Sequence, residues 1–158
     1  MVAVVELTYE PKGIADETYL PYSADFSEGY PFYSGDMDYI FTFDGNDDII
    51  SHKDIVLKIG EYNGCCATVS INGQYAGNID RDPYELSVKD HIKKGENKIT
   101  ISLCSTIRNM IGPNRYPQGD RSGCSTAKWD LPVNNSDMYD DVELIPFGIN
   151  NISIILKE

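Results

Sequence analysis

The chain has 158 residues and a formal net charge of −12. A chain of this length can bury roughly 70% of its unfolded surface, so its core needs no metal ion or disulfide to hold it. The acidic balance excludes the basic footprint that nucleic acids and anionic membranes require, so we expect neither partner.

The N-terminal segment lacks a basic region followed by an apolar run and a small-residue cleavage site. The missing signal does not define the cellular compartment, because a targeting segment could lie elsewhere on a parent protein. We interpret residues 1–158 as a single β-sandwich domain taken from such a larger protein. The domain would be secreted or at the cell surface if that parent is exported, and cytoplasmic otherwise.

The first third of the chain predicts short strands. Residues 2–9 form a leading strand, and the rest of the segment 1–31 is an irregular approach with three prolines. Residues 37–43 alternate apolar with polar side chains, residues 44–48 form an acidic turn, and residues 55–59 place every second apolar side chain inward.

The strongest local signal follows at residues 67–103. An apolar alternation over residues 67–71 runs into Asn72-Gly73, and both residues of this pair accept the positive φ of a type I′ hairpin turn. A Gly-Glu-Asn sequence at 95–97 predicts a second turn before a strand over 98–104. These signals predict a meander of antiparallel strands.

The remaining elements are shorter. Residues 84–88, 141–145 and 151–156 predict strands, and residues 88–94 predict at most one or two helical turns. Strand signals every 8–15 or so residues, with Gly, Asn and Asp between them, are typical of a sandwich or barrel. We therefore expect an all-β fold.

The motif order resembles a known module. Residues 32–35 (FYSG), followed by Tyr39 and Phe41, resemble the opening of the galactose-binding-like jelly-roll domain. That domain accompanies the catalytic barrel of β-galactosidase- and β-glucuronidase-type glycoside hydrolases. Residues 69–73 (VSING) and Gly77 resemble the hairpin of that module.

The resemblance continues along the chain. Pro83 and residues 94–99 (KGENKI) continue the hairpin motif, and residues 108–113 (RNMIGP) resemble a segment of related gut-bacterial hydrolase modules. Tyr139 and residues 146–149 resemble the closing strands. The resemblance implies an antiparallel jelly-roll β-sandwich without a catalytic residue, since the catalytic carboxylates of the family lie on a separate barrel.

The segment 105–135 is the candidate functional loop, because about thirty residues without periodicity inside a domain are commonly functional. Sugars are bound by aromatic platforms together with planar hydrogen-bonding groups. The candidate carbohydrate-binding residues are Trp129, Tyr116, Arg115, Arg121, Asn114, Asn109 and Asp130 of the loop, with Arg81 and Tyr84 beside it. The alternative is that Trp129 plugs the edge of the core while the arginines pair with surface acids.

Tyrosines also cluster in the N-terminal approach. Tyr19, Tyr22, Tyr30 and Tyr33 could line a second sugar surface, although covering the edge of the sandwich is the simpler interpretation.

The sequence contains no clear pattern of catalytic or metal-binding residues. Paired acids such as Asp36 and Asp38 lie beside turns, and neither histidine accompanies a nucleophile motif. The acidic segment 44–55 fails as an EF-hand loop because its sixth and twelfth positions are isoleucines. A structural calcium ion, which such jelly-roll modules often hold, stays an open alternative without assigned ligands.

The four cysteines, at 65, 66, 104 and 124, show no zinc-ligand spacing. Strand alternation predicts Cys65 on the inward face with Val69, and Cys66 and Cys104 on the outward face. We expect reduced thiols, and a Cys66–Cys104 bridge only where their strands are neighbours.

These observations favour a non-catalytic carbohydrate-binding or accessory module of a larger glycoside hydrolase. The alternative is a purely structural domain that packs against the enzyme and has no ligand of its own. The expected partner is a glycan or the catalytic domain of the same polypeptide, and in isolation the chain should be a monomer.

Overall fold

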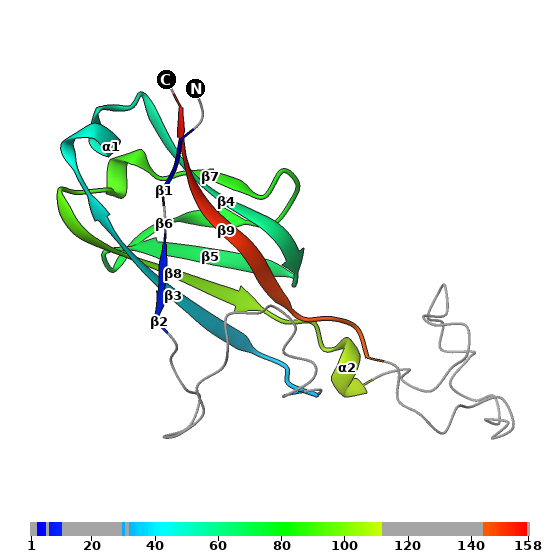
Figure 1. Cartoon of the computed structure of the whole chain (residues 1–158). Coiled ribbons are helices and arrows are strands. Elements are labelled where there is room, and N and C mark those ends of the chain that lie inside the picture. The colour runs from blue at the N-terminus through cyan, green and yellow to red at the C-terminus, as the bar shows by residue number, and fades with distance from the viewer. Residues whose placement is uncertain (1–2, 6, 11–29, 31, 112–143, 158) are drawn as a thin grey trace, which may run out of the picture.

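Two antiparallel β-sheets pack face to face in a computed structural model that describes residues 3–5, 7–10, 30, 32–111 and 144–157 (Figure 1). The four-stranded sheet has the order β1 (Ala3–Val5), β9 (Gly148–Lys157), β4 (Asp54–Asn63) and β7 (Glu85–Ser87). The five-stranded sheet has the order β2 (Thr8–Glu10), β3 (Asp36–Gly45), β8 (Gly95–Cys104), β5 (Cys66–Ile71) and β6 (Gln74–Ile79).

The all-β sandwich expected from the sequence is therefore confirmed. Within the described residues, three short helical segments accompany the strands: α1 (Asp47–Ser51), the 3₁₀ turn η1 (Lys89–His91) and α2 (Arg108–Ile111). The finer assignment as a jelly roll stays a prediction. No helix among the described residues has the length and apolar character needed to cross a membrane.

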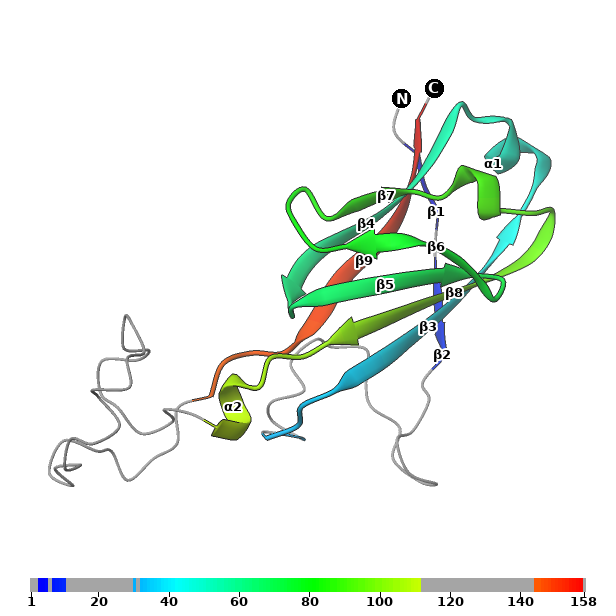
Figure 2. The same ribbon diagram turned by 180° about the vertical axis from the view of Figure 1, so that it is seen from behind.

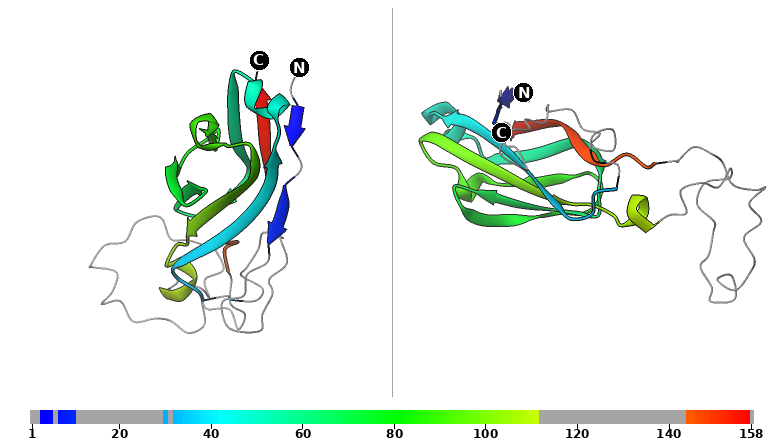
Figure 3. Two further views of the ribbon diagram at one scale, coloured as in Figure 1. Left: turned by 90° about the vertical axis from the view of Figure 1, so that its left-hand side faces the viewer. Right: turned by 90° about the horizontal axis from the view of Figure 1, so that it is seen from below.

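The core lies between the two sheets and follows the two-residue period of the strands. Ile55, Leu57 and Ile59 of β4 are buried, as predicted, and face Ile99 and Ile101 of β8 across the sandwich. Figure 3 shows the two layers edge-on. The alternation thus fixes which face of each strand enters the core.

A buried tyrosine links the two sheets. Tyr39 of β3 is 1% exposed, and its Oη accepts a hydrogen bond of 3.2 Å from the backbone N–H of Ile149 in β9. The hydroxyl is buried but has a partner, so the long side chain fills the core without the cost of an unsatisfied polar group.

The Asn72-Gly73 hairpin is confirmed. Asn72 has φ 53° and Gly73 has φ 79°, as a type I′ turn requires, and the turn joins β5 to β6. The register between these strands shifts between Val69 and Ser70, so the pairing is locally irregular there. The predicted turn at 95–97 is displaced: Gly95 has φ 87° but already begins β8.

Two local predictions were wrong in detail. The acidic segment at 44–48 is the end of β3 followed by the start of α1, because the side chain of Asn46 accepts from the N–H of Ile49 and caps a helix. A strand was also expected at 141–145. Residues 144 and 145, the described part of this range, are not in a strand, and residues 144–147 lead into β9 without pairing.

The closing strand was predicted at 151–156 and is longer. Ile154 and Leu156 are buried as expected, but Asn151 has φ 53° and interrupts the alternation, so that Ile149 is buried as well. The first strand is divided between the two sheets, since β1 pairs with β9 and β2 pairs with β3.

The two ends of the sandwich differ. The described termini lie side by side at one end, where Ala3 pairs with Leu156 (Figures 1 and 2). At the opposite end β4 and β8 finish while β3 and β9 begin, and the segments leading into and out of these strands gather there. This second end holds the candidate site.

Candidate functional site

Most of the predicted site residues fall outside the described structure. These are Asn114, Arg115, Tyr116, Arg121, Trp129 and Asp130. Their proposed role in sugar binding therefore stays a prediction, as does the assignment of the whole 105–135 segment. Three predicted residues are described: Arg81 and Tyr84 share one turn, where the N–H of Tyr84 donates to the carbonyl of Arg81 at 2.9 Å, whereas Asn109 lies apart from them in α2.

Asn109 of α2 holds the backbone rather than pointing outward. Its side chain is buried at 5% exposure, its Nδ2 donates to the carbonyl of Ile145 at 2.9 Å, and its Oδ1 accepts from the N–H of the same residue at 2.9 Å. This reciprocal pair attaches α2 to the segment before β9. Asn109 therefore positions the wall of the site.

Arg81 and Tyr84 lie in the turn between β6 and β7. Arg81 is exposed, and its Nε donates to Asp80 at 3.0 Å, which lowers the pKa of that carboxyl group. Tyr84, at φ 51°, stacks on Tyr62 with ring centroids 4.6 Å apart and nearly parallel planes. Tyr84 thus supports the site through Tyr62, while Arg81 faces solvent.

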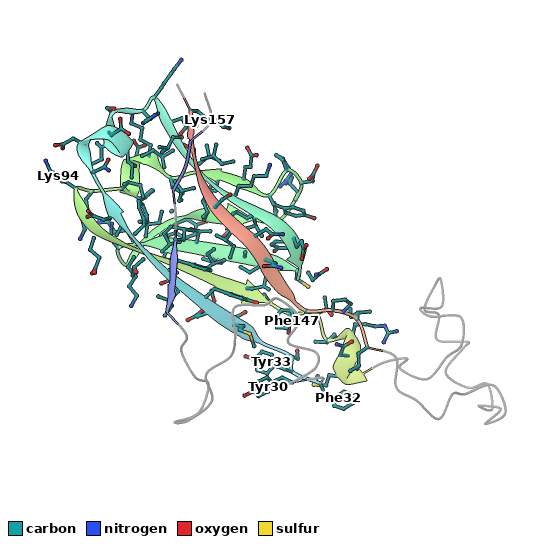
Figure 4. The ribbon with its side chains drawn as sticks, in the orientation of Figure 1. Tyr30, Phe32, Tyr33, Lys94, Phe147 and Lys157 are labelled. Carbon is teal, nitrogen blue, oxygen red and sulfur yellow. The ribbon has the colours of Figure 1, made fainter. Side chains whose placement is uncertain are left out.

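The site itself is a hollow of about 300 Å³ at the end of the sandwich opposite the described termini. Four aromatic residues contribute to its walls: Tyr30, Tyr33, Tyr62 and Phe147. The other lining residues are the small or polar Asn63, Gly64, Ser105, Thr106 and Asn109 and the apolar Ile145 and Pro146. Figure 4 shows Tyr30, Tyr33 and Phe147 gathered at this end of the ribbon, with Phe32 beside them.

Hydrogen bonds fix the aromatic walls in place. Tyr33 stacks near Phe147, with ring centroids 6.4 Å apart, and its Oη donates to the carbonyl of Asp36 at 2.6 Å. The Oη of Tyr62 donates to the carbonyl of Ile79 at 3.1 Å. Each hydroxyl oxygen that donates in this way keeps lone pairs with which to accept.

Burial is the main cause of a raised pKa at Tyr62, and the neighbouring Cys66 and Tyr84 add to it. The phenol therefore stays protonated throughout the physiological range.

The floor of the hollow is anchored to the five-stranded sheet. The backbone N–H of Gly35 donates to Oγ of Ser105 at 2.9 Å, and the N–H of Ser105 donates to the carbonyl of Gly35 at 2.9 Å. This pair continues the pairing of β3 with β8 beyond Cys104. The hollow is thus built on paired backbone.

Large apolar side chains lie exposed around the same end. Phe32 is 50% exposed, Ile107 is 54% exposed and Met110 is 52% exposed. Phe32 directly precedes Tyr33, Ile107 directly follows Thr106, and Met110 directly follows Asn109 in the sequence. We call these three residues the apolar rim.

The described residues that line the hollow include no pair of acidic side chains for acid–base hydrolysis. None of its described lining residues carries a carboxylate, whereas a glycosidase needs two. The described residues also hold no group of three or more potential metal ligands. What the arrangement can do is present aromatic faces and uncharged hydrogen-bonding groups.

Sequence reasoning identified part of this site. Tyr30 and Tyr33 belonged to the tyrosine cluster that was interpreted mainly as an edge cover, and both line the hollow. Tyr62 and Phe147 were missed. Their signal was weak, because each lies at the end of a strand where an aromatic residue is equally typical of a core.

Comparisons with known proteins agree with this architecture. No family model matches the chain. A protein of Formosa agariphila provisionally named a β-glucuronidase is 30% identical over 98 residues, which are 61% of this chain and 8% of that protein. The rhamnosidase of Novosphingobium sp. PP1Y matches with a TM-score of 0.56 and 25% identity, over 80% of this chain and 11% of the enzyme.

The β-D-mannosidase of Dictyoglomus thermophilum gives the same TM-score of 0.56 at 18% identity, over 98% of this chain and 22% of the enzyme. The chain has the fold of one domain of these glycoside hydrolases. The resemblance seen in its motifs is therefore confirmed. The chain spans 8%, 11% and 22% of the lengths of these three proteins.

Proposed function

We propose that this chain is a non-catalytic accessory domain of a larger glycoside hydrolase, with jelly-roll topology, and that its aromatic hollow binds a sugar. The observation that carries the proposal is the hollow itself: stacked aromatic side chains and uncharged polar groups lie together on a fold shared with domains of such enzymes. The absence of carboxylates from its described walls favours binding over hydrolysis.

The chemistry of the walls fits a pyranose ring. Sugar rings present apolar C–H faces that pack on aromatic rings, and each such contact is worth about 1–2 kcal/mol by analogy with other ring contacts. The described walls carry no lysine or arginine, so they suit a neutral sugar better than a uronate. One or two stacking contacts support an affinity of roughly micromolar to millimolar strength.

Tyr30→Ala tests the hollow. Tyr30 lines it, and its backbone carbonyl accepts a hydrogen bond from the N–H of Tyr33 that the substitution preserves, so truncating the ring should leave the fold intact. We expect affinity for a neutral oligosaccharide, measured by NMR titration with and without calcium, to fall about tenfold, since stacking is worth 1–2 kcal/mol. Tyr75→Ala, which removes a 63% exposed tyrosine on β6, is the matched control and should change nothing.

The same titration is also made with a Trp129→Ala variant and with acidic glycans. Trp129→Ala asks whether the 105–135 segment takes part, because the loss of binding in that variant alone would move the site there. If the unaltered chain binds no neutral or acidic glycan in either condition, sugar binding by this domain is wrong.

A second candidate function is packing against the catalytic domain of the same polypeptide. The apolar rim favours it, because three large side chains at least half exposed at one end are typical of a surface that a partner covers. In this case Ile107→Ser would weaken co-elution with the separately expressed catalytic domain, whereas Tyr75→Ser would not. Sugar binding should survive Ile107→Ser, which separates the two functions.

A further inference from the structure

Two thiols lie directly opposite each other at the end of the five-stranded sheet. Cys66 begins β5 and Cys104 ends β8, and the two residues are register partners on neighbouring antiparallel strands. Both side chains are half-buried and both thiols are free. The sequence analysis allowed a bridge between them only if their strands were neighbours, and β5 and β8 are neighbours.

The two side chains also share the outward face of the sheet. Their neighbours Ala67 and Leu103, which are partners in the next row, are fully buried in the core. Strand alternation therefore turns Cys66 and Cys104 to the other face. Cys65 was predicted to point inward but is exposed, because β5 begins only at Cys66 and Cys65 lies before it.

We propose that Cys66 and Cys104 are a modification site that forms a reversible cross-strand disulfide, with a low-molecular-weight disulfide such as oxidised glutathione as the oxidant. Directly opposed residues of an antiparallel pair have Cβ atoms about 4.5–5.5 Å apart, whereas a disulfide needs about 3.5–4.5 Å. The bond therefore closes with a small approach of the strands. It holds some strain, which makes it readily reduced again.

The reaction balances in two exchanges. The Cys66 thiolate attacks one sulfur of the small disulfide, which forms a mixed disulfide and releases one small thiol. The Cys104 thiolate then attacks the Cys66 sulfur, forms the Cys66–Cys104 bond and releases the second small thiol. Two protein thiols are oxidised, one small disulfide is reduced, and the protons pass to the released thiolates.

The surroundings of Cys104 bear on the second exchange. Its register partner on the other side is Asp36 of β3, and Cys66 of β5, with Cys65 just before that strand, lies near it. Burial first, and then hydrogen bonding to Asp36 and its charge, raise the pKa of the Cys104 thiol. Closure should accordingly accelerate as the pH rises.

The pair lies next to the aromatic hollow. Gly64 lines the hollow two residues before Cys66, and Ser105 lines it directly after Cys104. A bond between the cysteines would fix the start of β5 against the end of β8 at this wall. An effect of the bond on sugar affinity rests on the proposed function, whereas the bond itself does not.

The test treats the intact chain with oxidised glutathione at neutral pH and maps its tryptic peptides by mass. We expect residues 59–81 to become linked to residues 99–108, and a dithiol reductant to release them. Cys65→Ser and Cys124→Ser should retain the link, while Cys66→Ser and Cys104→Ser should lose it. Circular dichroism of Cys104→Ser and Cys104→Ala establishes that the variants are folded.

Three results would overturn the proposal. One is the absence of any link between these peptides in the folded chain. Another is a link that Cys65→Ser abolishes and Cys66→Ser retains, because Cys65 would then be the partner. The third is a link that forms only in urea. Sugar titration of the oxidised and reduced chains is scored separately, so a failure of sugar binding leaves the result for the disulfide unaffected.

Discussion

At the scale of single residues, two asparagines explain why the hairpin motif and the Gly-x-Asn motif occur together. Asn97 is fully buried, and its Oδ1 accepts from Nδ2 of Asn72 at 3.0 Å and from the N–H of Lys93 at 2.9 Å. Its Nδ2 donates to the carbonyls of Lys93 and Gly95. The two turns are thus held together by one amide network.

Replacing Asn97 tests that network. Asn97→Ala leaves part-buried backbone groups of Lys93 and Gly95 without their amide partner, and each such group costs about 1–3 kcal/mol. We expect the free energy of unfolding, measured in urea, to fall by about 3 kcal/mol. Asn78→Ala, at an exposed position on β6, is the control and should change it by less than about 0.5 kcal/mol. Equal effects of the two substitutions would contradict the role of the network.

Asp36 should control how fast the cysteine pair closes. Its hydrogen bond and charge add to burial in raising the pKa of Cys104, so Asp36→Asn lowers that pKa and increases the thiolate fraction at neutral pH. We expect linkage by oxidised glutathione at pH 7 to become several-fold faster, and the difference to disappear at strongly alkaline pH. Asp38→Asn, two residues further along β3, is the matched control. An unchanged rate would show that Asp36 does not hold the thiol protonated.

At the scale of elements, the edge of the four-stranded sheet depends on a small charge network. The carboxylate of Glu85 in β7 forms ion pairs with Nζ of Lys58 in β4 at 3.3 Å and with Nζ of Lys157 in β9 at 3.4 Å. Because β7 is only three residues long, these side chains supplement a short backbone ladder. The network connects β7 to both longer strands of its sheet.

The network gives stability a defined pH dependence. Burial opposes ionisation of Glu85, but hydrogen bonds from Lys58 and Lys157 outweigh it and lower its pKa. The stabilisation is thus present above the unfolded-state pKa of about 4.3 and is lost as the pH falls through the lower folded-state pKa. Glu85→Gln should cost about 0.5–1 kcal/mol at pH 7 and nothing near pH 2.

Urea unfolding at the two pH values measures this difference. The exposed Glu96→Gln on β8 is the control and should show no comparable loss at pH 7. A cost of Glu85→Gln that persists at low pH would indicate lost packing rather than lost charge.

At the scale of the whole molecule, one core joins the two sheets and unfolds with them. Ile101 of β8 is fully buried at the centre of the five-stranded sheet, and the buried residues of β3, β4, β5, β8 and β9 form one contiguous cluster. Ile101→Ala should lower the free energy of unfolding by about 3–4 kcal/mol. Thr100→Ala, on the other face of β8, should lower it by no more than about 1 kcal/mol.

Circular dichroism and amide exchange should report the same transition for both sheets. A variant in which one sheet unfolds while the other stays protected would contradict the single core.

The sequence by itself determined the local structure. The alternation in β4 and β8 predicted their buried faces, and Asn72-Gly73 predicted its turn, because both signals depend on neighbours within a few residues. It also carried the motif order by which the chain resembles a domain of glycoside hydrolases. It placed the site in the 105–135 segment, from which the structure describes only residues 105–111.

Only the tertiary structure decided which distant residues meet. It brought Tyr33 to Phe147, Tyr62 to Tyr84 and Cys66 opposite Cys104, and it turned the amide of Asn109 onto the backbone of Ile145. The physical reason is that the partner of a strand in an antiparallel sheet is chosen by packing across the whole core. A period of two specifies the face of a strand but not its neighbour.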